Sequence, residues 1–458
     1  MMSAMSETAA SLAMPVSRIA KLFEQERQRF VATHPRSIEM FRASSAVLLD
    51  GVPMNWMRRW PGGAPLFVDS AEGSHFEDVD GNSYVDFCLG DTGAMTGHRQ
   101  IATLGALGSN SRQGCTTMLP TEDAVWVGEE LRRRFGLPWW QFAMTATDAN
   151  RFIIRLARHL TGRSKILVFN WCYHGTVDET LHVLDGNRVV PRPGNIGSPA
   201  GPEATTRVVE FNDLEALERE LAMGDVAMVL CEPAMTNVGI VLPVPGYHVA
   251  LRELTRKYST LLAIDETHTI CVGPGGATAA WGLEPDLFVI GKAIGGGIPA
   301  AAYGMSDEFA ARIGSALGGQ YADVSGIGGT LSGSALALAA IRATLSTFLT
   351  DAEFEHTVPL ATAWSEGVQQ IVEKRGLDWG VQQLGSRAEY AFGPVARDGG
   401  QAERQIVPDL DELLHLWALN RGILLTPFHL MALMAPTTSK DDVDLHSEVF
   451  SEAIDALM

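Results

Sequence analysis

The sequence predicts an α/β fold with a mostly parallel central sheet. Short apolar runs alternate with segments of helical periodicity, and the runs cover residues 139–144, 165–169, 225–231, 261–264 and 287–290. The last two runs are rich in Leu, Ile, Val and Phe and are bounded by Gly, Pro and charged residues, which is typical of strands buried on both faces. Strands that alternate with helices predict parallel pairing, with helices on both faces of the sheet.

The chain ahead of this sheet is expected to form an arm and a β-meander. Residues 1–15 are small and polar and suggest a frayed tail, whereas residues 16–41 show a helical pattern. Residues 48–63 are rich in turn formers and contain two Trp and two Arg. Residues 66–89 alternate polar and apolar side chains around an Asp-Gly turn, which predicts a meander.

The chain beyond the sheet is expected to form a second, smaller α+β unit. Residues 314–333 are rich in Gly and Ser and predict a loop, and residues 334–349 predict an Ala-rich helix. We therefore divide the chain into an arm with a small-domain segment (1–75), a large domain (76–325) and a C-terminal small domain (326–458).

Composition excludes several classes of protein. The chain has 458 residues and is 46% hydrophobic and 19% charged, which indicates a globular protein with a large core. A net charge of −19 argues against nucleic acid as a partner, because phosphates require clustered Lys and Arg. The Arg132-Arg133-Arg134 run follows two glutamates on a predicted helix and is expected to face solvent.

Cysteine usage and targeting signals predict a cytoplasmic setting. The five cysteines are scattered and form no CxxC pair, so neither a disulfide framework nor a metal site is expected. The N-terminus lacks the pattern of a signal peptide, and no apolar run is long enough to span a membrane.

An acid and a lysine follow two strands of the predicted sheet. Asp265 closes the run 261–264, and Lys292 comes two residues after the run 287–290. Ligands of open α/β sheets bind at the carboxyl ends of the strands, so both side chains are expected at one rim. A lysine there can form a Schiff base and a carboxylate can hold a pyridinium nitrogen, which is the layout of a pyridoxal phosphate site. A surface ion pair with a structural lysine is the plain alternative.

A second rim feature is a possible phosphate site. Ala146 and Thr147 lie between the run 139–144 and the helix expected from about Asp148. Their backbone N–H groups and the threonine hydroxyl can bind an anion at the helix N-terminus. An ordinary N-cap explains the same residues, and caps far outnumber phosphate sites.

Three further residues follow a predicted strand or precede a predicted helix and are also candidates for the site. Tyr173 follows the run 165–169 and can stack on a flat ring, and Glu232 follows the run 225–231 and can support Asp265. Thr330 lies in a Gly-Gly-Thr-Leu-Ser-Gly segment ahead of the Ala-rich helix and is a second candidate for anion binding. A core tyrosine, a loop-starting glutamate and a helix cap are the plain alternatives.

The order of these features resembles that of a family. The chain is similar to class III, fold type I pyridoxal-phosphate-dependent aminotransferases, in the branch of glutamate-1-semialdehyde aminomutase and the β-amino-acid aminotransferases. The resemblance covers about residues 45–455, and its most specific parts are LLAIDETHT, GKAIGGGIPAAAYG and GGTLSGSALALAA. It implies a large cofactor-binding domain with a mostly parallel sheet, plus a smaller α+β domain from the N-terminal segment and the C-terminal part.

The resemblance also implies roles at matching positions. Lys292 would form the Schiff base and move the proton between substrate and cofactor, and Asp265 would keep the ring nitrogen protonated. Tyr173 would stack on the ring, and residues 146–147 would bind the phosphate. Thr330 would reach the phosphate of a neighbouring subunit, which requires a homodimer with shared active sites.

Two departures from the family pattern concern the cofactor. The usual Ser-Gly-Thr-Glu-Ala reads Thr-Ala-Thr-Asp-Ala at 145–149, which keeps the backbone N–H groups. The usual Asp-Glu-Val-Gln reads Asp-Glu-Thr-His at 265–268. His268 is therefore a candidate for the cofactor's 3′-oxygen, or else a polar neighbour without that role.

The third departure concerns the substrate carboxylate. Many ω-aminotransferases carry a late arginine that pairs with the glutamate of Glu-Pro, but residues 426–436 contain neither Arg nor Lys. The candidates that remain are Arg58, Arg59 and Arg387, because guanidinium binds carboxylate bidentately; surface arginines are the alternative. The missing arginine resembles the aminomutase branch.

These features together predict a homodimeric, cytoplasmic aminotransferase that moves an amino group from an amino acid to a 2-oxo acid through pyridoxamine phosphate (PMP). Trp and Met near the expected pocket favour a β-amino acid or a bulky apolar or aromatic amino acid. An aminomutase of the glutamate-1-semialdehyde type or an amino-acid racemase is the alternative on the same fold. A non-catalytic α/β ligand-binding protein is more distant. No nucleic-acid, membrane or metal partner is expected.

Overall fold

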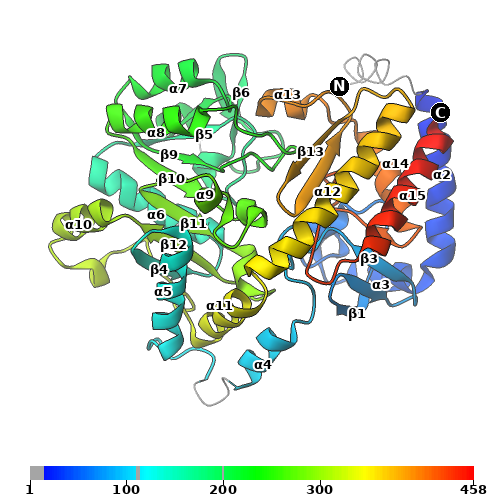
Figure 1. The fold of residues 1–458 in the computed structure, drawn as a ribbon, viewed down its shortest axis with the longest axis horizontal. Coiled ribbons are helices and arrows are strands. Elements are labelled where there is room, and N and C mark those ends of the chain that lie inside the picture. The colour runs from blue at the N-terminus through cyan, green and yellow to red at the C-terminus, as the bar shows by residue number, and fades with distance from the viewer. Residues whose placement is uncertain (1–14, 110–113, 199–200) are drawn as a thin grey trace.

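The computed structural model describes residues 15–109, 114–198 and 201–458. Two parts lie side by side, one around a large sheet and one that contains both ends of the described chain (Figure 1). Helix α12 (Asp351–Lys374) leads from the first part to the second. The N-terminal tail was expected at residues 1–15, and of these only Pro15 is among the described residues.

The large sheet has seven strands in the order β4-β12-β11-β10-β9-β5-β8. Six of them share one direction, because β12 is antiparallel to both of its neighbours and the other pairs are parallel. The mostly parallel sheet is therefore confirmed. The strands are β4 (Trp139–Ala143), β5 (Lys165–Phe169), β8 (Thr206–Val209), β9 (Val226–Cys231), β10 (Leu261–Asp265), β11 (Leu287–Ile290) and β12 (Ala301–Met305).

Burial explains which strands could be recognised in the sequence. Every residue of β9, β10 and β11 is buried, and their continuous apolar runs were correctly predicted as strands. Two strands of this sheet, β8 and β12, were missed, as was the separate antiparallel pair β6 (His182–Asp185) and β7 (Arg188–Pro191). Strand β12 contains Gly304 and continues a Gly-rich segment, and Gly is depleted in strands, so the sequence around it resembles a loop.

Helices cover the faces of this sheet. They are α5 (Glu122–Phe135), α6 (Ala146–Thr161), α7 (Leu214–Leu221), α8 (Tyr247–Lys257), α9 (Gly276–Ala280), α10 (Asp307–Ala316) and α11 (Ala335–Thr347). Helix α6 begins two residues before the predicted start, because the Thr145 side chain accepts a hydrogen bond from the Asp148 N–H as its N-cap. The expected loop 314–333 is partly wrong, since α10 continues to Ala316 and a 3₁₀ turn covers Tyr321–Asp323.

The second part is built from both ends of the chain. Residues 16–41 were predicted as one helical segment but form α2 (Val16–Thr33) and α3 (Pro35–Ser44). The break falls at His34, because the residue before a proline is pushed out of the helical region. Two small sheets follow, with the orders β1-β2-β3-β15 and β13-β14-β16.

The strands of this part are β1 (Val68–Glu72), β2 (His75–Asp78), β3 (Ser83–Asp86), β13 (Gly380–Leu384), β14 (Arg387–Ala391), β15 (Ile423–Leu424) and β16 (Met431–Leu433). The remaining helices of the fold are α4 (Ile101–Ser109), α13 (Gly399–Glu403), α14 (Pro408–Leu419) and α15 (Lys440–Leu457). The meander predicted at 66–89 corresponds to β1, β2 and β3. These strands share a sheet with β15, and the domain boundary expected at residue 75 stays a prediction.

One residue of the run 132–134, which was expected to face solvent, is buried instead. Arg134 is only 8% exposed, and its guanidinium donates to the carbonyl oxygens of Leu345, Leu349 and Pro274. It also pairs with Glu130 at 2.7 Å. The expectation fails because one face of α5 packs against α11, so that one of the three consecutive arginines must point inward.

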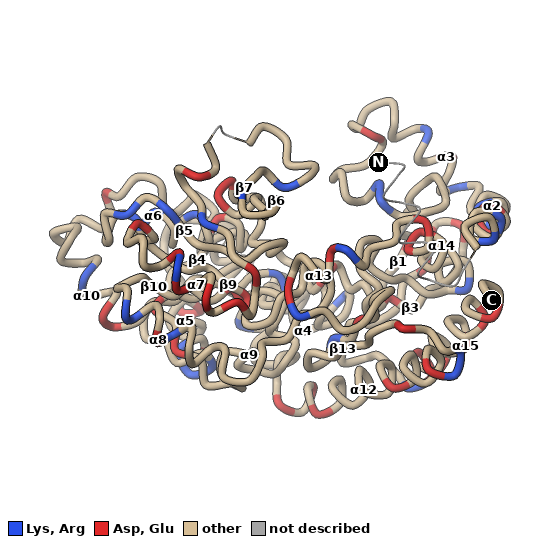
Figure 2. Tube along the Cα trace, turned by 90° about the horizontal axis from the view of Figure 1, so that it is seen from above, with Lys and Arg blue, Asp and Glu red and all other residues tan. Residues whose placement is uncertain are grey.

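Charge and membrane-crossing potential complete the description. Lys and Arg are interspersed with Asp and Glu along both parts (Figure 2). No single helix among the described residues is long and apolar enough to cross a membrane. Helices α11 and α12 would pass that test only as a pair, and they are bent by 72° at their junction.

Gly385 should matter because it joins the two parts. It lies in the β13–β14 turn at φ +59°, and an added Cβ would stand 2.1 Å from the Cys271 carbonyl oxygen. We predict that Gly385→Ala lowers the free energy of unfolding by about 2–4 kcal/mol, from left-handed backbone strain plus overpacking. Gly376→Ala is the matched control, with φ +66° and no atom near the added Cβ, and should cost about 1 kcal/mol. Equal losses in urea titrations would contradict the packing argument.

Candidate active site

A cavity of about 560 Å³ opens where the parallel strands end. Its lining includes residues that follow β4, β5, β9 and β11, namely Thr147, Tyr173, Glu232 and Lys292, and Asp265, the last residue of β10. The structure thus brings together side chains that are far apart in the sequence, because parallel strands present their carboxyl ends at one rim.

Asp265 is a buried carboxylate at this rim. Its Oδ2 lies 2.9 Å from His174 Nδ1 and accepts a hydrogen bond from Asn150 Nδ2 at 2.9 Å, and its Oδ1 accepts one from the Thr267 N–H. Burial alone would raise the pKa of this carboxyl, but His174, Thr267 and Asn150 together lower it to about 2. Asp265 is therefore ionised and can hold a cation in the cavity.

His174 supplies the balancing charge. Burial opposes its protonation, but the neighbouring Cys172 and the Asp265 carboxylate hold the pKa of the imidazole well above its usual value. Its side chain is fully buried, so the two groups form an ion pair that is screened from water. His174 acts by positioning Asp265, a role that the Tyr-His-Gly sequence did not reveal.

Lys292 projects into the same cavity from the loop after β11. Its Nζ donates to Asp91 Oδ2 at 2.8 Å and lies 2.9 Å from His268 Nε2. Burial and the lysine charge lower the pKa of His268 to about 3, so its ring is neutral and Nε2 accepts from the ammonium. Nδ1 then carries the proton and donates to Thr92 Oγ1 at 3.0 Å.

Asp91 is a site residue that sequence reasoning missed. It lies in the turn after β3, between Gly90 and Gly93, and reaches Lys292 only through the tertiary fold. A carboxylate within a Gly-rich turn directly after a strand is the one signal in the sequence that could have suggested it.

The N-terminus of α6 offers an anion site beside these residues. Thr145 is the cap, so the first-turn N–H groups of Ala146 and Thr147 have no acceptor within the helix. Thr147 Oγ1 accepts from the Thr176 N–H at 3.2 Å. Gly175 has φ +82°, and a Cβ there would stand 2.0 Å from Thr147 Oγ1, so this close approach requires glycine. Cap and anion site are therefore compatible.

Aromatic rings form one wall. Tyr173 is half-buried and lines the cavity, and the ring of Trp56 meets it edge-on with centroids 5.8 Å apart. Phe428 lies 5.7 Å from Trp56 in the same way. Trp56, from the N-terminal segment, lines the cavity, and Phe428, from the C-terminal segment, packs against Trp56 outside the lining.

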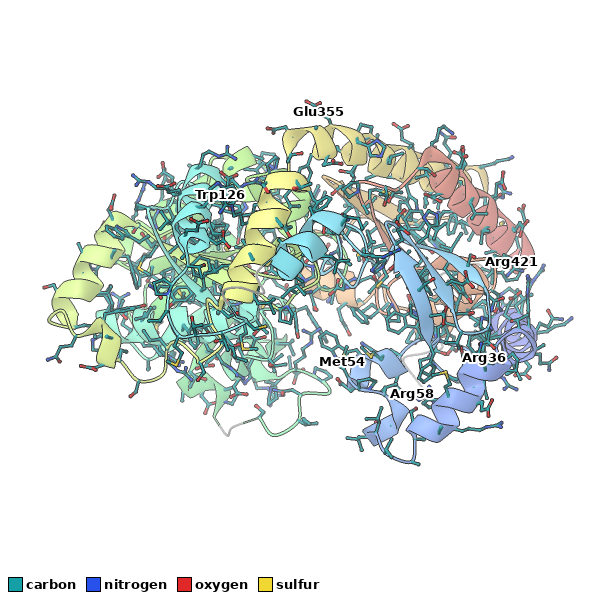
Figure 3. All side chains as sticks on the ribbon, turned by 90° about the horizontal axis from the view of Figure 1, so that it is seen from below. Arg36, Met54, Arg58, Trp126, Glu355 and Arg421 are labelled. Atoms are coloured by element: carbon teal, nitrogen blue, oxygen red, sulfur yellow. The ribbon has the colours of Figure 1, made fainter. Side chains whose placement is uncertain are left out.

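The three candidate arginines are placed very differently. Arg58 is exposed, and its guanidinium lies over Phe41 of α3, 4.8 Å from the ring centroid (Figure 3). Arg59 is also exposed and lies over Phe428 at 5.5 Å. Arg387 is fully buried, and its Nη2 donates to the Thr236 carbonyl and to Glu389.

Unpartnered polar atoms surround Arg387. Its Nε and Nη1 have no hydrogen-bond partner among the described residues, and neither has Glu232 Oε1. Glu232 Oε2 accepts from the Thr236 hydroxyl, and burial raises the pKa of this carboxyl to about 7. Two guanidinium N–H groups without acceptors are suited to a carboxylate ligand. Neither Thr330 nor any of the three arginines is among the residues that line the cavity. Thr330 is exposed, and its expected role across a subunit interface stays a prediction, as does the role of Arg387 in substrate binding.

Comparison with known proteins was made by sequence and by structure. The family model described as aminotransferase class-III matches residues 57–454. Glutamate-1-semialdehyde 2,1-aminomutase of Chloroflexus aggregans is 33% identical over 443 residues, which cover 92% of this chain and 98% of that protein. The enzyme named so in Sorangium cellulosum is 34% identical over 433 residues, which cover 92% of this chain and 97% of that protein.

Solved structures agree with this assignment. A glutamate-1-semialdehyde-aminomutase from Pseudomonas aeruginosa PAO1 superposes with a TM-score of 0.95 at 49% identity and covers 97% of this chain and 100% of that one. A lysine-to-alanine variant of that protein was crystallised in complex with PMP. An omega-transaminase from Sphaerobacter thermophilus gives a TM-score of 0.83 at 25% identity and covers 93% of this chain and 99% of that one.

The Asp265–His174 pair makes a direct prediction. Asp265→Asn removes the charge that keeps His174 protonated, so the pKa of His174 should fall toward or below the usual value of about 6.5. The pH dependence of the histidine signals in NMR spectra measures this shift. Asn150→Ala removes a neighbouring hydrogen bond without removing charge and should have a smaller effect. An unchanged His174 titration in Asp265→Asn would contradict the assigned pairing.

Proposed function

Because this chain belongs to the class III aminotransferase family, whose cofactor is pyridoxal phosphate, we propose that it is an aminomutase. It would move an amino group between neighbouring carbons of one amino–oxo acid of the glutamate-1-semialdehyde type. The relatives described above support this choice over the intermolecular transfer that the sequence first suggested. Both reactions share the cofactor and the lysine, so the distinction depends on how the substrate is held.

The observation that carries the proposal is that the carboxylate anchor is buried and fixed. Hydrogen bonds from Arg387 Nη2 to the Thr236 carbonyl and to Glu389 hold this side chain in place, yet two of its other nitrogens lack partners among the described residues. Residues 426–436 contain no Arg or Lys that could swing in and out. An aminotransferase must accept two different substrates in turn, whereas an aminomutase keeps one carbon skeleton. A rigid anchor suits the second task.

The residues of the cavity fit the cofactor. We infer that residues 146–147 bind its phosphate, that Tyr173 stacks on its ring and that Asp265 pairs with the ring nitrogen. Lys292 presents a primary amine for the covalent link. Neutral His268 and the unpartnered Thr267 hydroxyl offer further polar contacts.

The chemistry then divides between cofactor and chain. When bound, pyridoxal phosphate supplies an aldehyde that takes up an amino group and a ring that accepts electrons from a neighbouring C–H bond. Asp265 keeps a positive charge at the ring nitrogen, because it stays ionised. Lys292, held between Asp91 and His268, takes a proton from one carbon and returns it to another. Arg387 holds the substrate carboxylate throughout.

A second candidate is the intermolecular aminotransferase acting on a β-amino acid or a bulky aromatic amino acid. The aromatic wall of Trp56, Tyr173 and Phe428 favours it, because such a surface can hold an aryl group. The two reactions differ in whether a second oxo acid is needed.

We also propose a homodimer in which subunits share active sites. Thr330 and Leu331 are exposed in the turn before α11, where they could reach a neighbouring subunit. Light scattering of the purified protein and loss of cofactor on Thr330→Ala would bear on this assembly.

Product analysis tests the proposed reaction. The loaded enzyme should convert glutamate 1-semialdehyde to its 5-amino-4-oxo isomer without any added oxo acid, and an isotopic label on nitrogen should stay in the product. Lys292→Ala should abolish both the conversion and the visible absorbance of the bound cofactor. If turnover requires a 2-oxo acid acceptor and releases a new oxo acid, the aminotransferase is the correct choice.

Arg387 can be tested separately. We predict that Arg387→Lys, which keeps the buried charge but loses the bidentate geometry, raises KM by about tenfold or more, since a hydrogen bond to a charged group contributes about 1.5–3 kcal/mol. The turnover number should change less than KM. Arg58→Lys is the matched control at an exposed position and should leave both constants unchanged. A KM that changes equally in the two variants would count against Arg387 as the anchor.

A further inference from the structure

The contact between Asp91 and Lys292 is not explained by the roles assigned so far. Asp91 Oδ2 accepts a hydrogen bond from Nζ at 2.8 Å, while Oδ1 lies 3.9 Å from His268 Nδ1 and has no hydrogen-bond partner among the described residues. When Lys292 is joined to the cofactor, its nitrogen is no longer a free ammonium. Asp91, whose neighbours Gly90 and Gly93 line the cavity, is then an anion without that counter-ion.

The backbone around this contact is strained. Asp91, Thr92 and Lys292 have φ values of 49°, 80° and 48°, in the left-handed region that non-glycine residues rarely adopt. Such a conformation persists only where its surroundings impose it, most often at functional sites. Threonine is β-branched, which makes its conformation the least expected of the three.

The fold holds this strained turn in place. The Leu89 N–H donates to Asp86 Oδ1 at 2.8 Å, and the Ala94 N–H donates to the Leu89 carbonyl at 2.8 Å. The Met95 N–H donates to the Thr92 carbonyl at 3.1 Å. The Asp91 carboxylate is thereby aimed at Nζ by its own turn, independently of where the lysine side chain goes.

Charge keeps Asp91 ionised. Burial alone would raise the pKa of its carboxyl, but the Lys292 ammonium, and after it Arg387, holds the pKa well below the usual range. When Lys292 leaves, the Asp91 carboxylate loses its nearest cation, and a second cation at the same place restores the pairing. The substrate of the proposed reaction carries a primary ammonium.

We propose that Asp91 is the docking site for the ammonium group of the substrate, occupied in turn by Lys292 and by the incoming amine. The inference rests on the proposed function and adds the residue that receives the substrate nitrogen. Asp91 would then be a second anchor, opposite in charge to Arg387, for a substrate that carries one amine and one carboxylate.

The exchange is balanced in atoms and charge. On exchange, the substrate nitrogen would bond to the cofactor carbon, the bond from that carbon to Nζ would break, and two protons would pass from the substrate ammonium to Nζ. Asp91 therefore faces one ammonium before the exchange and one after it. No oxidant or further reactant is required.

Calorimetry can test this without turnover. The proteins are loaded with 4-deoxypyridoxine 5′-phosphate, which has a methyl group where the cofactor has its aldehyde and cannot bond to any amine. Propylammonium is the probe, and propanol is the uncharged control ligand. The proteins compared are the wild type, Lys292→Ala, the double variant Lys292→Ala/Asp91→Asn, and Lys292→Ala/Glu232→Gln as a matched change of another cavity carboxyl.

We expect Lys292→Ala to bind propylammonium at least tenfold more tightly than the wild type, where Lys292 occupies Asp91, and at least tenfold more tightly than the Asp91→Asn double variant. Propanol should not distinguish them, and the Glu232→Gln double variant should resemble Lys292→Ala. Equal affinities throughout, or an equal loss with Glu232→Gln, would overturn the assignment. If the double variants do not fold, the comparison of Lys292→Ala with wild type still decides. Failure of all the proteins to take up the phosphate analogue would instead overturn the proposed function.

Discussion

An ionised carboxylate inside the protein governs the electrostatics of this site. Asp265 is almost completely removed from water, so its charge is unfavourable unless cations compensate it. His174 provides one cation and hydrogen bonds provide further stabilisation, which together lower the carboxyl pKa to about 2. The cavity side of Asp265 is thereby kept ready for a second cation, and a protonated ring nitrogen meets that need.

Other buried charged side chains near Asp265 are also paired with an opposite charge, and Glu232 is the exception discussed here. Asp91 faces Lys292, and Glu389 faces both Arg387 and His429. Glu232 has no cation within ion-pair distance among the described residues, and burial raises the pKa of its carboxyl to about 7. The charge of Glu232 can therefore change near neutral pH. Its state will alter how strongly Arg387 is drawn toward a substrate carboxylate.

Sequence reasoning reached the residues that follow strands and missed those that depend on the fold. Lys292, Asp265 and Tyr173 were found because buried apolar runs mark strands and parallel strands end at one rim. Asp91 was not found, since its relation to Lys292 depends on a left-handed turn far away in the sequence. Arg387 could not be separated from Arg58 and Arg59, because burial on β14 is decided by packing between the two parts.

The groups proposed to react come from one part of the molecule, and the residues proposed to select the substrate come from the other. Lys292, Asp265 and the N-terminus of α6 all belong to the large sheet and its loops, and every residue of its strands β9, β10 and β11 is buried. Arg387, Trp56 and Phe428 come from segments at the two ends of the chain. The position of the proposed carboxylate anchor and of these aromatic rings therefore depends on the packing of the second part. Asp91 lies in the turn that follows β3 of the small sheet, next to Gly90 and Gly93 of the cavity lining, so the proposed ammonium site stands at the junction of the two parts. A substrate with an amine and a carboxylate would bridge that junction, and its length would have to match the distance between Asp91 and Arg387.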